Sequence, residues 1–338
     1  MTRNQQLGVA AGLLISAFFL WQAFNGLNPA AVWQEVQQAQ FGWLLVGVGI
    51  FYVSMVVIAW RWGFLLNAVK RIPLRDLTEL VAIGYMGNNV YPFRAGEVLR
   101  VALLYRWHRV PVARTTLAII VERVLDGVVM LTFIIVPLRF IDIASPELRT
   151  AVAFATPIFI VAVAVFFVLA AAPNALRRIL TLVTGLLPGK VGELVGKLGE
   201  DIIQGLESLR SPRDLAGTVF ASFLSWLINA GVYWVVGFAF GLNVSFPVML
   251  TVCGVVNLAG LIPASPGQFG IFEFFTIAVL VVVLGEGSRQ QVTAYALVNH
   301  VVIWLPPTVL GFVLLARRGL GVSAITQAGQ QPAEPPPA

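Results

Sequence analysis

Apolar residues run through this chain in long blocks that short polar stretches separate. A helix needs about 20 mostly apolar residues to cross the hydrocarbon core of a bilayer. Six blocks have this length and predict full membrane-spanning helices. They lie at about 7–25, 41–60, 115–138, 150–172, 215–241 and 293–316.

The first block also permits an interpretation as a secretory signal peptide, with Arg3 as a short basic flank. A signal peptide ends in a cleavage site of small residues, and no clear motif of that kind follows residue 24. The sequence therefore favours a retained first helix.

Two further apolar blocks, residues 77–107 and 247–285, are interrupted by prolines and glycines. An arm of about 14 helical residues extends only about 21 Å, which enters a bilayer without crossing it. Each block therefore predicts two half-length helices joined at an irregular turn, as a re-entrant hairpin. The turn residues are Pro92 and Gly96 in the first block, and Pro263, Pro266, Gly267 and Gly270 in the second.

Charged residues are scarce, at 11% of the chain against 58% hydrophobic residues. A soluble domain has roughly 25% charged residues, so this composition predicts an all-α polytopic membrane protein.

If both hairpins return to the side they enter, 18 Lys and Arg lie on one side and three on the other, with Arg123 inside a span. The positive-inside rule makes the basic side cytoplasmic. This topology predicts a cell inner-membrane protein with both termini in the cytoplasm. The three on the far side are Arg139, Arg149 and Arg289, and the 18 are Arg3, Arg61, Lys70, Arg71, Arg75, Arg94, Arg100, Arg106, Arg109, Arg114, Arg177, Arg178, Lys190, Lys197, Arg210, Arg213, Arg317 and Arg318.

The same topology predicts an internal repeat. Residues 41–138 and 215–316 each contain a span, an interrupted block and a second span. The two units start on opposite sides of the membrane, so they form an inverted repeat. Many secondary transporters are built this way and bind substrate where the paired interrupted segments meet.

The repeat units belong to one predicted transmembrane domain, residues 1–318, which includes a cytoplasmic linker at about 173–214. Within that linker, residues 188–213 have the apolar periodicity of an amphipathic helix. This helix either lies on the membrane surface or serves only as a connection. Residues 319–338, which end in QQPAEPPPA, predict a disordered cytoplasmic tail.

Several function classes lack support in the sequence. The basic residues lie in short loops, so nucleic acid is not a predicted partner. One cysteine and two histidines supply no metal-ligand cluster, and we predict neither a metal nor a cofactor. No arrangement of nucleophile, base and acid supports hydrolytic catalysis, so no catalytic residue is predicted.

Ionisable residues at the first interruption are the main candidates for binding. Arg94 and Arg100 suit an anionic headgroup, because a guanidinium binds phosphate through two hydrogen bonds and a helix start adds free N–H groups. Alternatively, both arginines contact lipid phosphates at the surface or act only as topology signals. Glu97 and Glu273 each follow an interruption, where they either offset the helix dipole or bind a proton or a substrate amine.

Three charged residues, Glu122, Arg123 and Asp126, lie inside the span at 115–138. Ionisable groups at this depth are costly and usually face a protein interior or a wet cavity. We predict an ion-pair network with Arg94, Glu97 or Arg100, which is either purely structural or part of a gate.

Polar amides accompany both interruptions and the last span. They predict hydrogen bonds to backbone groups that the breaks leave free. The residues are Asn88, Asn89, Asn257 and Asn299.

Three motifs together resemble one known family. They are NVYPFRAGEVLR (89–100), VERVLD (121–126) and PASPGQFGIFE (263–273). The resemblance is to the lysylphosphatidylglycerol synthase transmembrane region, or flippase-like, family, and covers most of residues 7–318. It implies a domain that moves lipids between leaflets. The bifunctional members also have an aminoacyl-transfer domain, and only 20 residues follow Arg318 here, so lipid synthesis is not expected.

We therefore predict a lipid flippase that takes an anionic or headgroup-modified lipid, either a phospholipid or a polyprenyl-linked lipid. The alternatives are a membrane enzyme or enzyme subunit acting on a lipid phosphate, and a structural partner in cell-envelope assembly. The predicted partner is a membrane lipid, and a homodimer stays open. The predicted substrate-binding residues are Asn89, Arg94, Glu97, Arg100, Ser265 and Glu273.

Overall fold

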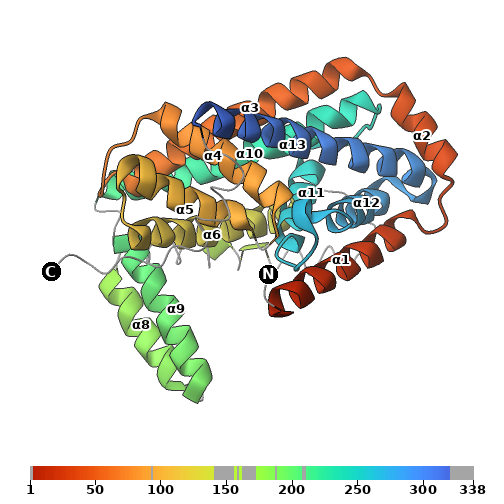
Figure 1. The fold of residues 1–338 in the computed structure, drawn as a ribbon. Coiled ribbons are helices and arrows are strands. Elements are labelled where there is room, and N and C mark those ends of the chain that lie inside the picture. Colours follow the sequence, from red (N-terminus) through yellow and green to blue (C-terminus); the bar gives the residue numbers. More distant parts are fainter. Residues whose placement is uncertain are drawn as a thin grey trace.

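The computed structural model describes residues 3–92, 94–140, 156–157, 160–161, 173–186, 189–207 and 211–319. Within these ranges the chain forms twelve α-helices and no strands. Most helices run side by side in one body, from which α8 and α9 project as a pair (Figure 1). The helices are α1 Arg3–Phe24, α2 Pro29–Gln38, α3 Phe41–Leu66, α4 Leu74–Val90, α5 Ala95–His108, α6 Val112–Ile135, α8 Pro173–Leu186, α9 Gly189–Glu207, α10 Pro212–Ala239, α11 Phe246–Ala259, α12 Ile271–Leu284 and α13 Arg289–Arg317.

The distribution of polar and apolar side chains is that of a membrane protein. Large apolar side chains such as Leu14 and Val282 are 72% and 86% exposed on the outside of the bundle. Arg61, Glu122 and Glu273 are instead 1–2% exposed in its interior. Water would penalise this arrangement, whereas a bilayer solvates the apolar exterior and leaves charged groups to pair inside.

Five segments of the described chain are long and apolar enough to cross a bilayer. They are Gln6–Phe24, Phe41–Leu66, Pro212–Ala239, Pro266–Leu284 and Glu286–Arg317. Four of these correspond to predicted full spans, while Pro266–Leu284 belongs to the second interrupted block. The predicted span at 115–138 forms α6, whose three central charges set it apart from the others. The span predicted at 150–172 lies outside the described residues except for 156–157 and 160–161.

Helix α2 was missed by the sequence analysis, which searched for blocks of spanning length. Its start nevertheless carries a clear signal. Asn28 caps the helix by accepting a hydrogen bond from the Ala30 N–H at 3.0 Å, and Pro29 occupies the first turn. Both are favoured at helix N-termini.

The first predicted interruption is confirmed, and it lies between Val90, where α4 ends, and Ala95, where α5 begins (the first interruption). Gly96, predicted as a turn residue, lies instead in the first turn of α5, because the break is complete before it. Arg94 precedes α5 with a left-handed backbone, at φ 52°. Glycines bring the two helices close together. A Cβ on Gly96 would collide with the Gly84 carbonyl oxygen, and one on Gly87 would lie 2.6 Å from the Gly96 Cα. Small residues permit this approach of two backbones in membrane proteins.

The second predicted interruption is also confirmed, and it separates α11 from α12 at residues 260–270 (the second interruption). It contains the 3-10 turn η2, Pro266–Gln268. Gly267 and Gly270 have φ values of 75° and 89°, and Gln268 between them has φ 61°. Only glycine adopts such values at little cost, so Gln268 is held in this conformation by its surroundings.

Helices of the two predicted repeat units pack on one another. Helix α3 packs along α10, α4 along α13, and α6 along α11. At the first of these contacts the Ser54 hydroxyl donates to the Ser225 carbonyl oxygen at 3.2 Å. These three pairs each join one unit to the other, whereas α5 packs mainly on α4 and α12 mainly on α11 within their own units.

The linker differs from the single amphipathic helix predicted at 188–213. It contains two helices, α8 and α9, which pack on each other and are joined by an ion pair of 2.9 Å between Arg177 and Glu200. Helix α9 also packs on α6. The predicted amphipathic helix corresponds to α9, which packs on α8 and α6. The apolar residues of α9 therefore need not all face a membrane surface. The predicted disordered tail lies outside the described residues apart from Gly319.

We expect Gly96→Ala to lower the thermal stability of the purified protein in detergent. The new methyl group would meet the Gly84 carbonyl oxygen, and overpacking typically costs about 1–3 kcal/mol. Gly49→Ala is a matched control, because Gly49 is exposed on α3 and has open space around it. Equal melting temperatures for the two variants would show that α4 and α5 do not approach at Gly96.

Candidate functional site

A buried set of charged side chains connects α3, α5 and α6. We call it the central ionic cluster, and it consists of Arg61, Arg100, Glu122, Arg123 and Asp126. Arg61 forms ion pairs with Glu122 and, at 2.6 Å, with Asp126. Glu122 and Asp126 are four residues apart and share one face of α6. The guanidinium therefore lies between two carboxylates, in a region from which water is excluded.

Arg61 corrects the sequence analysis, which placed this residue among the cytoplasmic loop arginines. Helix α3 continues to Leu66, beyond the predicted end of the span at residue 60. Arg61 therefore lies within the helix and is only 2% exposed. The signal that could have revealed it is its place between Trp60 and Trp62 in a continuing apolar run.

Helix α10 completes the surroundings of Arg61 and Asp126. The Trp226 Nε1–H donates to Asp126 Oδ1 at 2.7 Å. Arg61 also donates to the Ser222 hydroxyl at 3.4 Å. These neutral donors and acceptors are the additional partners that a buried ion pair needs to offset its loss of hydration.

Arg100 approaches the cluster from α5, as predicted. Its guanidinium lies 3.4 Å from Glu122 and 4.8 Å from the centre of the Trp62 ring. A Cβ on Gly84 would lie 2.7 Å from the Arg100 Cδ, so the glycine makes room for the arginine side chain. The predicted pairing of Arg100 with Glu122 is present, although Arg61 also binds this carboxylate.

The accessible side of the central ionic cluster lies at the first interruption. We call it the rim, and it consists of Arg94, Glu97 and Arg123. Glu97 lies 3.7 Å from both Arg94 and Arg123. The side chains of Arg94 and Arg123 are 37% and 38% exposed, whereas those of the interior members are at most 10% exposed. Four guanidinium groups, with Arg94 included, face three carboxylates. The set therefore has one excess positive charge, and its accessible side is the side that bears Arg94 and Arg123.

Arg94 also joins the two interruptions. Its Nη2 donates to the Gly260 carbonyl oxygen at 3.0 Å. The Gln268 side-chain amide donates to the same oxygen at 3.4 Å. Polar side chains from both interruptions thus converge on one carbonyl group at the end of α11.

The predicted amide residue Asn89 binds the last helix. Its Nδ2 donates to the Trp304 carbonyl oxygen at 3.1 Å and to the Thr308 hydroxyl at 2.9 Å. The Trp304 indole N–H donates in return to the Asn89 carbonyl oxygen at 3.4 Å. Asn89 therefore ties the end of α4 to α13, which is a structural use of its amide.

Among the other predicted amides, Asn257 binds the Cys253 carbonyl oxygen of its own helix at 2.8 Å. Asn299 is fully buried, and its side-chain amide has no hydrogen-bond partner in the described part of the chain. The Asn88 side-chain oxygen lies where a Cβ on Gly96 would approach it to 2.7 Å.

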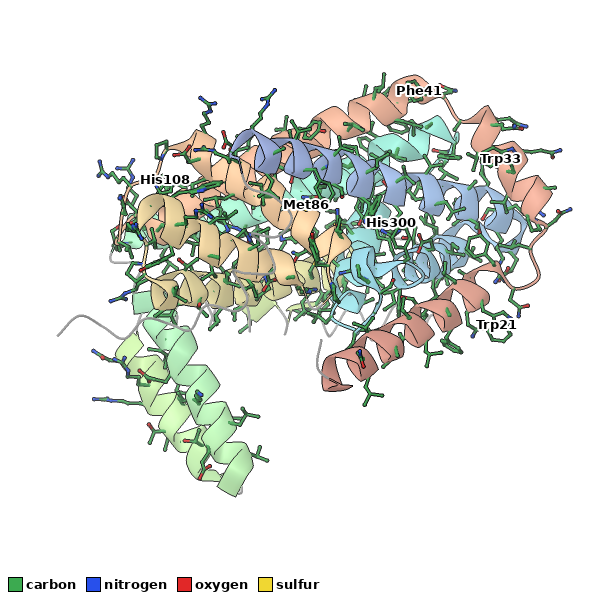
Figure 2. All side chains as sticks on the ribbon, viewed as in Figure 1. Trp21, Trp33, Phe41, Met86, His108 and His300 are labelled. Atoms are coloured by element: carbon green, nitrogen blue, oxygen red, sulfur yellow. The ribbon has the colours of Figure 1, made fainter. Side chains whose placement is uncertain are left out.

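Glu273, one of the predicted substrate-binding residues, pairs with His300 from α13. Its Oε1 lies 2.6 Å from His300 Nδ1, and its Oε2 accepts from the Gly270 N–H at 2.7 Å. The second bond is the helix-start use of Glu273 that the sequence left open. His300, which the sequence analysis did not include in the site, lies within the bundle, whereas His108 lies near one end (Figure 2).

Ser265, the remaining predicted substrate contact, binds the first helix. The Ser16 hydroxyl donates to the Ser265 hydroxyl at 2.9 Å and accepts from the Ser265 N–H at 2.9 Å. The structure thus brings Arg94, Glu97 and Arg100 together with the α6 charges, while Ser265 and Glu273 hold the second interruption to α1 and α13.

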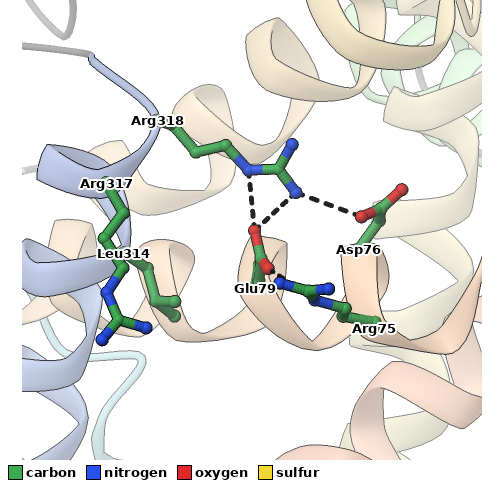
Figure 3. A pocket seen from close by; sticks show the side chains of 6 residues that line it. All are labelled: Arg75, Asp76, Glu79, Leu314, Arg317 and Arg318. Carbon is green, nitrogen blue, oxygen red and sulfur yellow. Dashed lines mark hydrogen bonds and ion pairs between the residues drawn. The ribbon is translucent and has the colours of Figure 1, made fainter.

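A separate pocket of about 340 Å³ lies between α4 and the end of α13 (Figure 3). Arg318 binds Asp76 at 3.1 Å and Glu79 at 2.6 Å across it. The hydrogen bond to Glu79 raises the pKa of the Arg318 guanidinium, which therefore stays charged. These ion pairs fasten the last helix to the start of the first interrupted segment. The lining residues are Arg75, Asp76, Glu79, Leu314, Arg317 and Arg318.

Neither the pocket nor the central ionic cluster has the composition of a metal site. Over the described ranges, no three His, Cys, Asp or Glu side chains converge in a way that could hold a metal ion. Each carboxylate of the central ionic cluster is already paired with a guanidinium. The partly exposed guanidinium groups of Arg94 and Arg123 are of the chemical type that binds anions.

Comparison with known proteins identifies a family. Residues 9–311 match the family described as Lysylphosphatidylglycerol synthase TM region. A UPF0104 membrane protein of Methanothermobacter thermautotrophicus is 25% identical over 321 residues, which cover 89% of each chain. UPF0104 membrane protein PH1989 of Pyrococcus horikoshii is 22% identical over 338 residues, covering 95% of this chain and 99% of that protein.

Another relative carries an enzymatic name. Glycosyltransferase AglD of Haloferax volcanii is 24% identical over 328 residues, which cover 88% of this chain and 52% of that protein. This chain therefore spans about half the length of the Haloferax relative.

We expect Glu122→Gln to lower thermal stability strongly, because it leaves Arg61 and Arg100 facing a neutral amide. Breaking a buried ion pair costs about 3–5 kcal/mol. Adding Arg100→Gln should recover part of the loss, since one stranded charge is removed and Arg61 remains. Melting temperatures of both single variants and the double variant measure this coupling.

Arg114→Gln is the matched control for Arg100→Gln. Arg114 is exposed at the start of α6, so its effect should simply add to that of Glu122→Gln. An Arg100→Gln effect that is equally additive would contradict the pairing of Arg100 with Glu122.

Proposed function

We propose that this chain, which belongs to the lysylphosphatidylglycerol synthase TM region family, moves a lipid with an anionic or modified headgroup between membrane leaflets. The lipid is a phospholipid or a polyprenyl-linked lipid. The headgroup passes between the two interruptions, and its acyl or prenyl tails stay in the bilayer. The transporter works in the cell inner membrane with both termini in the cytoplasm.

One observation carries this proposal: a partly exposed, net positive rim lies where the two interruptions meet. Arg94 reaches the second interruption at Gly260, and Arg123 and Glu97 lie beside it. A lipid phosphate could replace the weak contacts of 3.7 Å to Glu97 with bidentate hydrogen bonds to a guanidinium. The excess positive charge favours such an exchange.

We further propose the inverted-repeat topology, with six full spans and two re-entrant hairpins. Reciprocal packing supports it, because α4 packs on α13 and α6 packs on α11, while the equivalent helices α3 and α10 pack on each other. A two-fold axis in the membrane plane would generate this pattern. Ser54 and Ser225, which meet between α3 and α10, are separated by 171 residues, as are Pro92 and Pro263.

A second candidate function is an enzyme, or an enzyme subunit, that acts on a lipid phosphate. It is favoured only by the name of the Haloferax relative, of which this chain covers 52%. The carboxylates of the central ionic cluster are held by arginines, which leaves no free general base there. We therefore prefer the transporter, and formation of a new lipid product would favour the enzyme.

We expect Arg94→Ala to abolish translocation in vesicles that contain phosphatidylglycerol with a fluorescent tail. The variant removes the guanidinium that faces the headgroup path. Arg94→Lys should restore part of the rate, since a point charge cannot reproduce the two-pronged contact of arginine. The rate is measured by quenching the label in the outer leaflet.

Arg114→Ala serves as the control, because it removes an exposed arginine at the start of α6, outside both interruptions. It should translocate the labelled lipid at the wild-type rate. If Arg94→Ala does the same while keeping its melting temperature, Arg94 is not the headgroup contact.

We expect cysteines placed at positions 75 and 109 to be labelled from the same side of the membrane. Position 75 lies in the first turn of α4 and position 109 directly follows α5, so a re-entrant pair returns the chain to the side it left. Cys253→Ala provides the background without native cysteine, and a membrane-impermeant maleimide is the probe. Labelling from opposite sides would contradict the re-entrant topology.

A further inference from the structure

The buried side chains of Glu273 and His300 form hydrogen bonds that require a definite number of protons on the pair. His300 Nε2 lies 2.8 Å from the Gly267 carbonyl oxygen, and Nδ1 lies 2.6 Å from Glu273 Oε1. A carbonyl oxygen only accepts, so Nε2 must carry a proton. A second proton must then lie between Nδ1 and Oε1, on one atom or the other.

The pair is neutral as a whole in either arrangement. It is an imidazolium beside a carboxylate, or a neutral imidazole beside a carboxylic acid. Both contain one proton more than a neutral histidine and an ionised glutamate would contain. Burial favours this neutral state, since Glu273 is 1% exposed and His300 is 4% exposed.

We infer that Glu273 and His300 form a proton-binding site whose occupancy holds the second interruption closed. Loss of the shared proton leaves only one hydrogen on the imidazole ring, so either Nδ1 or Nε2 has a bare lone pair. At Nδ1 this lone pair faces the carboxylate, and at Nε2 it faces the Gly267 carbonyl oxygen. The pair gains a buried negative charge, and one of the two contacts that hold the turn must break.

The turn between α11 and α12 is bound by both members of the pair, so loss of the proton acts on it directly. Its backbone is held at Gly267 by His300 and at Gly270 by Glu273, with the left-handed Gln268 between them. The Gln268 side chain binds the Gly260 carbonyl oxygen that Arg94 also binds. Release of the turn therefore changes the contact between the two interruptions.

Few other charged groups lie on the elements around the pair. Helix α11 and the turn η2 contain no Asp, Glu, Lys or Arg, and α12 contains only Glu273. Helix α13 has Arg289 and Arg317 at its ends, and α1 begins at Arg3. Helix α4, which packs on η2 and α13, has Arg75, Asp76 and Glu79 near its opposite end. Arg94 is the cation that reaches the second interruption, through a carbonyl group.

The aromatic surroundings also suit a protonated ring. Phe272 stacks on His300 with ring centres 4.3 Å apart and planes inclined by 22°. The Phe269 ring lies 4.8 Å away on the side of the turn. Ring faces attract cations, and these two rings also separate the histidine from water.

The proton count can be read directly from the histidine ring. Full-length protein labelled with ¹⁵N-histidine, in a His108→Gln background, gives nitrogen resonances from His300 alone. We expect a protonated Nε2 at neutral pH, with Nδ1 either protonated as well or accepting from the carboxylic acid. A neutral ring with its proton on Nδ1 and none on Nε2 would overturn the inference.

Stability against pH tests the same site without transport. The pair keeps its contacts to Gly267 and between its two side chains only while it holds the shared proton. Stability should therefore fall once the pH is high enough to remove that proton. Glu273→Gln should remove this dependence, because its amide can donate to Nδ1 and accept from Gly270. Glu286→Gln, at an exposed carboxylate beyond α12, should keep the wild-type dependence, and an equal fall in all three proteins would contradict the proton site.

The consequence for transport rests on the proposed function. In the fluorescent phosphatidylglycerol assay, an imposed pH gradient should change the wild-type rate and leave the Glu273→Gln rate unchanged. A wild-type rate that ignores the gradient would overturn the coupling. Absence of translocation in every variant would count against the proposed function, and the nitrogen resonances would still decide the proton site.

Discussion

The pairing of buried charge at Arg61 governs how the helices fit together. A guanidinium removed from water costs several kcal/mol unless it is paired and hydrogen-bonded. Here Glu122 and Asp126 of α6 bind it, and Ser222 of α10 accepts from it. Arg100 of α5 joins through Glu122. Helices α3, α5, α6 and α10 are therefore fixed at one depth, because sliding any of them would leave a buried polar group without its partner.

Much of the fold could be predicted, because a bilayer leaves few options for a backbone. Helices must satisfy their own hydrogen bonds, so long apolar blocks predict helices and Pro or Gly within them predicts breaks. The breaks at Pro92 and at 263–270 occur where expected. The short helix α2 and the division of the linker into α8 and α9 were missed, because neither produces an apolar block of spanning length.

The candidate site was predicted in part, and its gaps have a physical origin. Sequence gives the depth of Glu122 and Asp126 along their helix but no distance to another helix. Arg61 was therefore taken for a loop residue at the end of a span, although it is the main counter-charge. His300 was not among the predicted site residues, and only the fold brings it to Glu273. Partners on the same or the next helix, such as Arg100, are the ones that sequence order can suggest.

The two interruptions differ in charge, and one carbonyl group connects them. The first has an excess positive charge and faces an accessible rim, whereas the second is closed around a neutral pair. Arg94 and Gln268 both donate to Gly260, and both have the left-handed backbone that costs a non-glycine residue about 1–2 kcal/mol. On the proposed function, a substrate anion would draw on Arg94, and loss of the proton from Glu273 and His300 would act on the turn that carries Gln268. Both events would thus act on the hydrogen bonds to the Gly260 carbonyl group, from opposite sides.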